Sequence, residues 1–246
     1  MPTSLSRRSL RAEVSLLLSN HLGVPVAAFD SLARDRVFLD SLKVDASSLE
    51  GYLAPDSYEF LPGTSPEVAF RTMAERQQTV LRRGMTGRDS LPLGFTVHQI
   101  LSLASIVESE AVKDDERPHI ARVYINRLER GMRLQADPTV SYGLGRSPHS
   151  RVYLRQLRSN TPFNTYLYVG LPPGPICNPG RESIEAVLEP TPGVGDLYFV
   201  ARGDGRHNFA RTYAEHLANI RVARSQQSGA GARSATAESL LAMPPS

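Results

Sequence analysis

Cysteine is almost missing from this sequence, and its scarcity excludes two kinds of site. Cys177 is the single cysteine among 246 residues, so neither an intramolecular disulfide nor a cysteine-rich metal cage can form. Its thiol is best interpreted as a small apolar side chain in the interior. A chain of this length can nevertheless bury a full hydrophobic core, in one large domain or in one domain with an appendage.

Long apolar runs are absent as well. No stretch reaches the roughly 18 uninterrupted apolar residues that a transmembrane helix needs. Arg7 and Arg8 superficially resemble a twin-arginine export signal, but no apolar run follows them. Instead, apolar residues recur there at helical spacing and predict an amphipathic helix: Leu10, Val14, Leu17 and Leu18. Two interpretations stay open, a soluble protein or a sequence whose membrane anchor lies upstream of its first residue.

Neither sign of charge dominates, and the basic residues form no tract. Lys and Arg number 28 against 25 Asp and Glu, and they are scattered singly or in pairs such as Arg82 and Arg83. This distribution argues against nucleic acid as a partner.

Several catalytic signatures are also missing. The six histidines show no paired spacing of the kind that binds zinc, and no serine lies in a glycine elbow. The glycines at 143–145 and 170–174 do not form a phosphate-binding loop. We therefore expect no metal and no cofactor, which leaves carboxylate chemistry.

The periodicity predicts an α+β fold, a helix-rich domain with short strands and long Pro/Gly-rich loops. Residues 1–49 are expected to form a connecting region of short helical pieces, and 50–224 the principal domain. The tail 225–246, rich in Ser, Gly and Ala, is expected to be disordered. Helix and turn signals predict helices over about 65–83, from Thr96 to Glu108 or just beyond, 114–131, 181–188 and 212–224, a strand over 196–201, and loops through most of 132–192.

Two glutamates lie at the end of the third apolar helical pattern. Glu108 directly follows Ile106 and Val107, and a carboxyl group sunk in an apolar wall can hold a proton near neutrality and donate it to a leaving group. Glu110 is two residues further, so on a helix the two side chains point to roughly opposite sides and cannot share one cleft. We take Glu108 as the candidate acid and Glu110 as a solvated residue. Periodicity alone leaves equal weight for both glutamates merely solvating a helix end.

Polar clusters with aromatic neighbours follow in the second half of the chain. Amide side chains beside flat aromatic faces suit a saccharide, whose hydroxyls need hydrogen bonds and whose rings stack. Any single cluster taken alone is better explained by loop capping or core packing, and Asp137 before Pro138 is often simply a turn former. The clusters are Asn126 with Arg127, then Gln135, Asp137 and Thr139, then Asn164, Thr165 and Tyr166, with Tyr142, Phe163 and Tyr168 as aromatic faces.

The order of several short strings resembles the endolytic murein transglycosylases, the MltG or YceG-like family. The resemblance extends over roughly 50–224, and several motifs in a fixed order make chance a poor explanation. The strings are Glu50-Gly-Tyr-Leu-Ala-Pro-Asp-Ser-Tyr58, Ala104-Ser-Ile-Val-Glu-Ser-Glu110, Val123-Tyr-Ile-Asn-Arg-Leu128, Gly131-Met-Arg-Leu-Gln-Ala-Asp-Pro-Thr-Val140, Asn164-Thr-Tyr166, Gly170-Leu-Pro-Pro-Gly174, Asn178-Pro-Gly180, Leu197-Tyr-Phe-Val200 and His207-Asn-Phe209.

The resemblance implies a bacterial lyase that cuts peptidoglycan glycan strands internally, between N-acetylmuramic acid and N-acetylglucosamine, and terminates nascent strands. It implies Glu108 as the single acid and base, which closes a 1,6-anhydro ring on the muramic acid, whereas glycoside hydrolysis uses a carboxylate pair. Together with the clusters it points to a substrate-binding set: Asn126, Arg127, Gln135, Asp137, Thr139, Tyr142, Asn164, Thr165, Tyr166 and Asn178.

The resemblance also implies partners and a location. The partners are peptidoglycan strands and peptidoglycan synthases, and the location is the cell envelope, at the inner membrane and facing the wall. Members of this family usually begin with a membrane-spanning helix and a LysM-like module, which this sequence does not include. The alternative function is a non-catalytic glycan-binding or divisome-scaffold module, for which replacing Glu108 with Gln would leave function unchanged.

Overall fold

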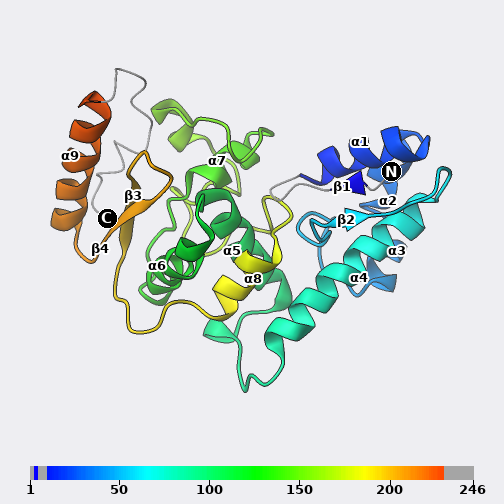
Figure 1. Ribbon diagram of the computed structural model, residues 1–246, viewed down its shortest axis with the longest axis horizontal. Helices are drawn as coiled ribbons and strands as arrows, with labels where there is room; N and C mark the ends of the chain where they lie inside the picture. The colour runs from blue at the N-terminus through cyan, green and yellow to red at the C-terminus, as the bar shows by residue number, and fades with distance from the viewer. Residues whose placement is uncertain (1–2, 5–9, 230–246) are drawn as a thin grey trace. The chain divides into compact units, whose positions relative to one another are not determined.

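The computed structural model describes residues 3–4 and 10–229 (Figure 1). The chain forms two compact units, each built from two separate stretches of sequence. The first comprises Met1–Glu108 with Gly174–Leu188, and the second comprises Ser109–Pro173 with Glu189–Ser246. Helices dominate and the strands are short, so the predicted α+β class is confirmed.

The first unit is an assembly of helices with one small antiparallel strand pair. Helix α1 packs on α2, and α4 packs on both α2 and α8. Phe29 of α2 meets Phe70 of α4 edge to face, with ring centroids 5.5 Å apart. The elements are β1 (Thr3–Ser4), α1 (Arg11–Leu22), α2 (Val26–Leu32), α3 (Arg36–Ser41), β2 (Ser57–Tyr58), α4 (Pro66–Met85), the 3-10 turn η1 (Pro92–Gly94), most of α5 (Val97–Glu110) and α8 (Arg181–Leu188), with β1 paired to β2.

Helix α4 follows its sequence signals at the start and departs from them at the end. The Ser65 hydroxyl accepts a 3.4 Å hydrogen bond from the Val68 amide, which caps the helix. The helix continues through Gly84 to Met85, beyond the expected end near residue 83. A Cβ atom at Gly84 would lie 2.6 Å from Leu188. Gly84 therefore permits close packing of α4 on α8. Val68, in the first turn of α4, is 54% exposed.

Helix α5 carries both candidate glutamates. A capping box starts the helix at the expected Thr96, since the Gln99 amide donates to the Thr96 hydroxyl and the Thr96 amide donates to the Gln99 side chain. Its apolar residues are buried on every side of the helix, not along one stripe. Glu108 ends the first unit, and Ser109 and Glu110 belong to the second.

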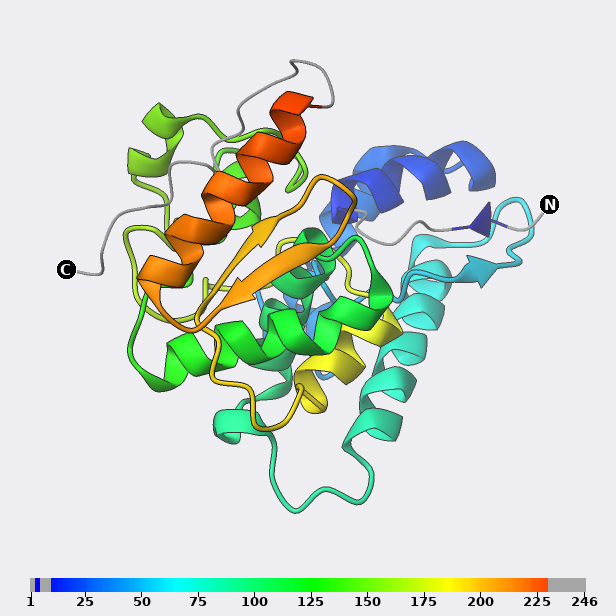
Figure 2. The same cartoon turned by 60° about the vertical axis from the view of Figure 1, so that its left-hand side comes forward.

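The second unit is organised around a β-hairpin. Strands β3 (Tyr198–Ala201) and β4 (His207–Ala210) pair antiparallel, with Tyr198 opposite Ala210. Helix α9 (Tyr213–Gly229) lies along both strands (Figure 2), and α6 (Arg117–Glu129) contacts β3. The remaining elements are η2 (Asp114–Glu116), α7 (Asp137–Gly143) and η3 (Leu154–Arg158).

Several sequence expectations for this unit need correction. Strand β4 and helix α7 were not expected, and Asp137 begins a helix with Pro138 in its first turn. Helix α9 runs to Gly229, beyond the expected end at Arg224. The rest of the expected disordered tail, 230–246, lies outside the described residues. Across residues 3–4 and 10–229, no helix combines the length and the apolar character needed to cross a membrane.

Candidate functional site

Glu108 lies in the interior of the first unit. Its side chain has no exposed surface, and its Oε2 accepts a 3.0 Å hydrogen bond from the Gly180 amide and a 2.9 Å bond from the Ser183 hydroxyl. Gly180 directly precedes α8 and Ser183 lies in its first turn. At this end of a helix a negative charge is stabilised by the helix dipole and by the amides that lack intrahelical partners. Glu108 therefore stabilises the start of α8.

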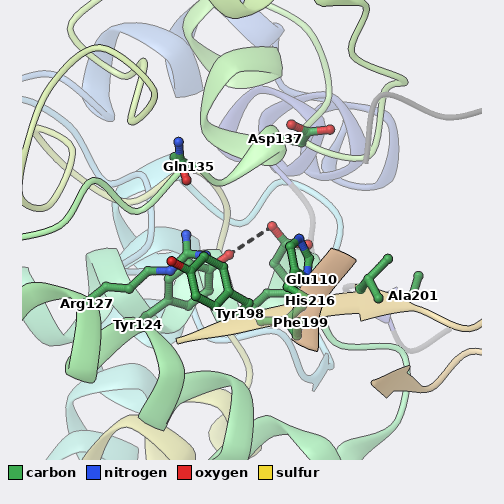
Figure 3. Close-up of a pocket in the computed structure, with 10 residues that line it drawn as sticks. Glu110, Tyr124, Arg127, Gln135, Asp137, Tyr198, Phe199, Ala201 and His216 are labelled. Atoms are coloured by element: carbon green, nitrogen blue, oxygen red, sulfur yellow. Dashed lines mark hydrogen bonds between the residues drawn. The ribbon is translucent and has the colours of Figure 1, made fainter. Parts of the chain in front are cut away.

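Glu110 instead lines a pocket that lies wholly within the second unit (Figure 3). Its side chain is half-buried. As the helical spacing predicted, the two glutamates do not share one cleft. The pocket is lined from α5, α6, the loop after α6, α7, β3 and α9 by Glu110, Tyr124, Arg127, Gln135, Asp137, Tyr198, Phe199, Val200, Ala201 and His216.

Tyr124 is a hydrogen-bond partner of the Glu110 carboxylate. Its hydroxyl donates a 3.1 Å hydrogen bond to Glu110 Oε1 (Figure 3). Burial, reinforced by the charge of Glu110, raises the pKa of Tyr124 well above its ordinary value. The ring meets Phe199 edge to face at 5.7 Å, which fixes its direction. Tyr124 is thus a permanent hydrogen-bond donor to Glu110.

Arg127 provides the positive charge of the pocket. Its Nε donates to the Leu197 carbonyl and its Nη1 to the Leu134 carbonyl, each at 2.6 Å. The guanidinium also lies 5.4 Å from the centroid of the Tyr198 ring, a cation–π arrangement. Burial lowers the pKa of Arg127 below its ordinary value, yet an arginine remains charged in proteins. Arg127 therefore joins the loop after α6 to the hairpin while facing the pocket.

The loop before α7 presents two more of the predicted residues to the pocket. Gln135 has a left-handed backbone, with φ at 51°, and its amide donates to the Thr165 carbonyl at 3.1 Å. Asp137 Oδ1 accepts a 2.6 Å hydrogen bond from the Tyr166 hydroxyl. Gln135 and Asp137 are therefore held in place by the 164–166 segment.

Thr139, Thr165 and Tyr166 form the layer behind these two residues. The Thr165 hydroxyl accepts from the Ala136 amide at 3.0 Å and lies 2.9 Å from the Thr139 hydroxyl. Burial, followed by the charge of Asp137, raises the pKa of Tyr166 well above its ordinary value. None of the three belongs to the pocket lining, so they support the site from behind.

Four predicted residues have other surroundings. Asn126 donates to the carbonyls of Val194 and Asp196 at 3.0 and 2.9 Å, which holds the chain leading into β3. Asn164 donates to the carbonyls of Leu157 and Ser159 at 3.0 and 2.8 Å. Neither residue lines the pocket.

Tyr142 and Asn178 are the other two. Tyr142 packs on Phe163 with ring centroids 4.7 Å apart. Asn178, in the first unit, accepts hydrogen bonds from the amides of Gly51 and Leu53 at 2.9 and 3.2 Å. These two contacts organise loops.

His216 is a pocket residue that the sequence argument missed. It is 3% exposed and stacks on Tyr198 with ring centroids 5.2 Å apart. Burial, followed by the charge of Arg127, lowers its pKa to about 4, so the imidazole is neutral at physiological pH. A histidine four residues into a helix, with no second histidine at metal-binding spacing, carries no local sign of a site.

The described residues contain no group of three or more His, Cys, Asp or Glu side chains arranged to hold a metal ion. The pocket instead offers one carboxylate with a tyrosine donor, a second carboxylate, one guanidinium and the rings of Tyr198 and Phe199. Such a combination suits a neutral, hydroxyl-rich ligand with flat ring faces and can supply a proton to it.

The chain is similar in sequence to a known protein family and to characterised relatives. A model of the YceG-like family matches residues 8–222. The chain is 39% identical over 170 residues to an endolytic murein transglycosylase of Bacillus subtilis, covering 68% of this chain and 46% of that protein. It is 32% identical over 199 residues to an endolytic murein transglycosylase of Streptococcus pneumoniae, covering 77% of this chain and 36% of that protein. The chain thus spans less than half the length of these curated relatives.

The fold itself matches a crystal structure. A YceG-like protein of Listeria monocytogenes superposes with a TM-score of 0.77 at 31% sequence identity. The superposition covers 87% of this chain and 74% of that one.

Proposed function

Because the chain belongs to the YceG-like family, we propose that it is a lytic transglycosylase that cuts peptidoglycan glycan strands internally, between N-acetylmuramic acid and N-acetylglucosamine. The observation that carries the proposal is the half-buried carboxylate of Glu110, which faces a pocket lined by aromatic and polar side chains and receives the Tyr124 hydroxyl. The names of the B. subtilis and S. pneumoniae relatives support the same reaction.

We propose Glu110 as the catalytic acid and base in place of Glu108. A general acid must come within hydrogen-bond distance of the oxygen that it protonates. Glu108 has no exposed surface, and two donors at the start of α8 bind its Oε2. Glu110 needs no rearrangement of the core to meet a ligand, because it already lines the pocket.

The reaction needs only one carboxyl group. Glu110 donates its proton to the glycosidic oxygen while the bond from that oxygen to C1 of the muramic acid breaks. The resulting carboxylate then accepts the proton of the C6 hydroxyl while the oxygen of that hydroxyl bonds to C1. A 1,6-anhydro ring closes, no water is consumed, and Glu110 returns to its protonated form.

The other pocket residues bind and orient the strand in this proposal. Arg127, Gln135 and Asp137 offer hydrogen bonds to sugar hydroxyls and acetamido groups, and Tyr198 offers a ring face for stacking. Thr139, Thr165 and Tyr166 position Gln135 and Asp137 from behind. Asn126, Tyr142, Asn164 and Asn178 act through the loops that they hold, without touching the substrate.

The products distinguish this reaction from its nearest alternative. Purified glycan strands are incubated with the protein, and the new ends are analysed by mass spectrometry. The proposal predicts that fragments released from the interior of the strands end in 1,6-anhydromuramic acid. Reducing ends would indicate hydrolysis with Asp137 as the second carboxylate, and unchanged strands that still bind the protein would indicate the non-catalytic glycan-binding or scaffold function.

We also propose the setting of this activity. The catalytic domain is assigned to 50–224, since every pocket residue falls in that range, with 1–49 as the connecting region. The expected location is the cell envelope at the inner membrane, where cleavage would terminate nascent strands made by peptidoglycan synthases. Chemical cross-linking in cells tests the synthase association, and recovery of the protein without any synthase would argue against it.

A further inference from the structure

One segment of the second unit is free of negative charge. No Asp or Glu occurs between Asp137 and Glu182. Within this stretch, η3 and its flanks carry three exposed arginines, Arg151, Arg155 and Arg158. With no acidic side chain nearby in the sequence, these arginines form a local concentration of positive charge.

The same segment exposes large apolar side chains. Single exposed apolar residues are ordinary on protein surfaces, but a group of them marks an interaction site. Leu154 is 51% exposed and Val169 is 61% exposed. The group consists of Tyr153, Leu154, Leu167, Tyr168 and Val169.

Hydrogen bonds connect the two parts of this group. The Asn164 side-chain amide donates to the carbonyls of Leu157 and Ser159. The backbone carbonyl of Asn164 accepts from the amides of Leu167 and Tyr168 at 3.0 and 3.1 Å. The Tyr168 hydroxyl donates to Asn160 at 2.6 Å. The segments 151–158 and 167–169 are therefore joined in one surface, here called the Arg–apolar surface.

Charged and apolar groups are interleaved on this surface. The guanidinium carbons of Arg151 and Arg155 lie 5.4 and 6.0 Å from the centroid of the Tyr153 ring. Arginines that can reach phosphate oxygens while aromatic and aliphatic side chains enter the adjoining apolar layer are typical of proteins that bind a membrane surface. Tyrosine in particular favours the interface between headgroups and acyl chains.

We propose that the Arg–apolar surface docks on an anionic phospholipid bilayer. A hydrated acidic polymer of the cell wall would attract the arginines equally, but it offers no apolar layer for Leu154, Leu167 and Val169. A bilayer satisfies both sets of side chains. The inference does not depend on which glutamate is catalytic, because none of the surface residues lines the pocket.

Vesicle binding by the full 246-residue chain tests the proposal. Sedimentation is measured with vesicles of phosphatidylglycerol and phosphatidylethanolamine and, separately, of phosphatidylcholine. The chain is expected to bind the anionic vesicles, to release them as salt rises, and to bind phosphatidylcholine at least tenfold more weakly. Equal binding to both vesicle types, or no binding to either, would overturn the proposal.

Two variants separate the contributions of charge and apolar contact. Since one basic residue near an anionic bilayer contributes about a factor of 5, Arg155→Glu with Arg158→Glu should weaken binding by about 20-fold or more. Leu154→Ser with Val169→Ser keeps the charge and should also weaken it. The matched controls are Arg82→Glu with Arg83→Glu on α4, and Val37→Ser on α3, all exposed; they should change binding less than twofold.

A parallel assay identifies the other class of partner. The same variants are sedimented with isolated murein sacculi, and their folding is checked by thermal unfolding. If the Arg–apolar variants lose binding to sacculi and retain full binding to anionic vesicles, the surface serves the wall polymer and the proposal is wrong.

Discussion

The Tyr124 hydroxyl donates a 3.1 Å hydrogen bond to Oε1 of Glu110, from a ring that is buried on all sides. A fixed donor of this kind sets the direction of the carboxylate and stabilises its ionised form. This pair, and not the more deeply buried Glu108, is the centre of the proposed chemistry.

Replacing Tyr124 with Phe should slow the reaction without abolishing it. A hydrogen bond to a charged group contributes about 1.5–3 kcal/mol, so kcat should fall roughly tenfold or more while KM changes little. Because the donor favours the ionised carboxylate, its removal should move the pH optimum upward. Strand cleavage measured across pH checks both effects, with Tyr213→Phe, outside the pocket lining, as control. An unshifted optimum would reduce Tyr124 to a packing role.

Removing the Glu108 carboxylate should weaken the fold. In Glu108→Ala the Gly180 amide and the Ser183 hydroxyl lose a charged acceptor at the start of α8, which should cost about 3 kcal/mol or more. Glu108→Gln retains an acceptor and should cost less. Thermal unfolding measures the difference. A Glu108→Gln protein with unchanged stability and no cleavage would instead return Glu108 to the catalytic role.

Stability should fall in mild acid because of His216. Its pKa is lowered from 6.5 to about 4 in the folded protein, so between these values the unfolded chain binds a proton that the folded chain does not. The contribution of the neutral His216 to the free energy of unfolding is therefore fully present above pH 6.5 and is lost as the pH falls toward 4. His216→Phe keeps a ring against Tyr198 and should flatten the decline in melting temperature from pH 7 to pH 4.5. An unaltered decline would show that other groups cause it.

Replacing Gln135 should raise the stability of the protein and weaken its binding of substrate. A non-glycine residue with φ at 51° carries about 1 kcal/mol of backbone strain, so Gln135→Gly should raise the melting temperature slightly. The same change removes a side chain from the pocket and should raise KM for glycan strands. If both the melting temperature and KM are unchanged, neither the strain nor the substrate contact is significant.

Strong local signals made much of the fold predictable. The Thr96 and Gln99 capping box located α5, and the expected helix over 181–188 is present as α8. Strand β4 was missed because His207 and Ala210 are buried with half-buried residues between them, which is not the alternation of a strand with one buried face. Asp137 and Pro138 fit a turn and a first helical turn equally well, and only the following packing selects the helix.

The site was harder to predict than the fold. The spacing of Glu108 and Glu110 separates them onto different sides of α5, but it does not say which side faces the core. Apolar residues lie on all sides of the helix around Glu108. The apolar neighbours that favoured Glu108 as the candidate acid therefore bury it completely. Of the predicted substrate-binding set, Arg127, Gln135 and Asp137 line the pocket. Tyr198 and His216 enter it from elements distant in the sequence, which no local pattern reveals.

The most direct test compares Glu110→Gln with Glu108→Gln on purified glycan strands, with the rate of formation of 1,6-anhydromuramic acid ends as the readout and strand binding measured in parallel. The account predicts that Glu110→Gln reduces the rate by at least a thousandfold with binding retained, and that Glu108→Gln retains cleavage in the fraction that is folded. Full activity in Glu110→Gln would contradict the assignment of Glu110 as the acid and base.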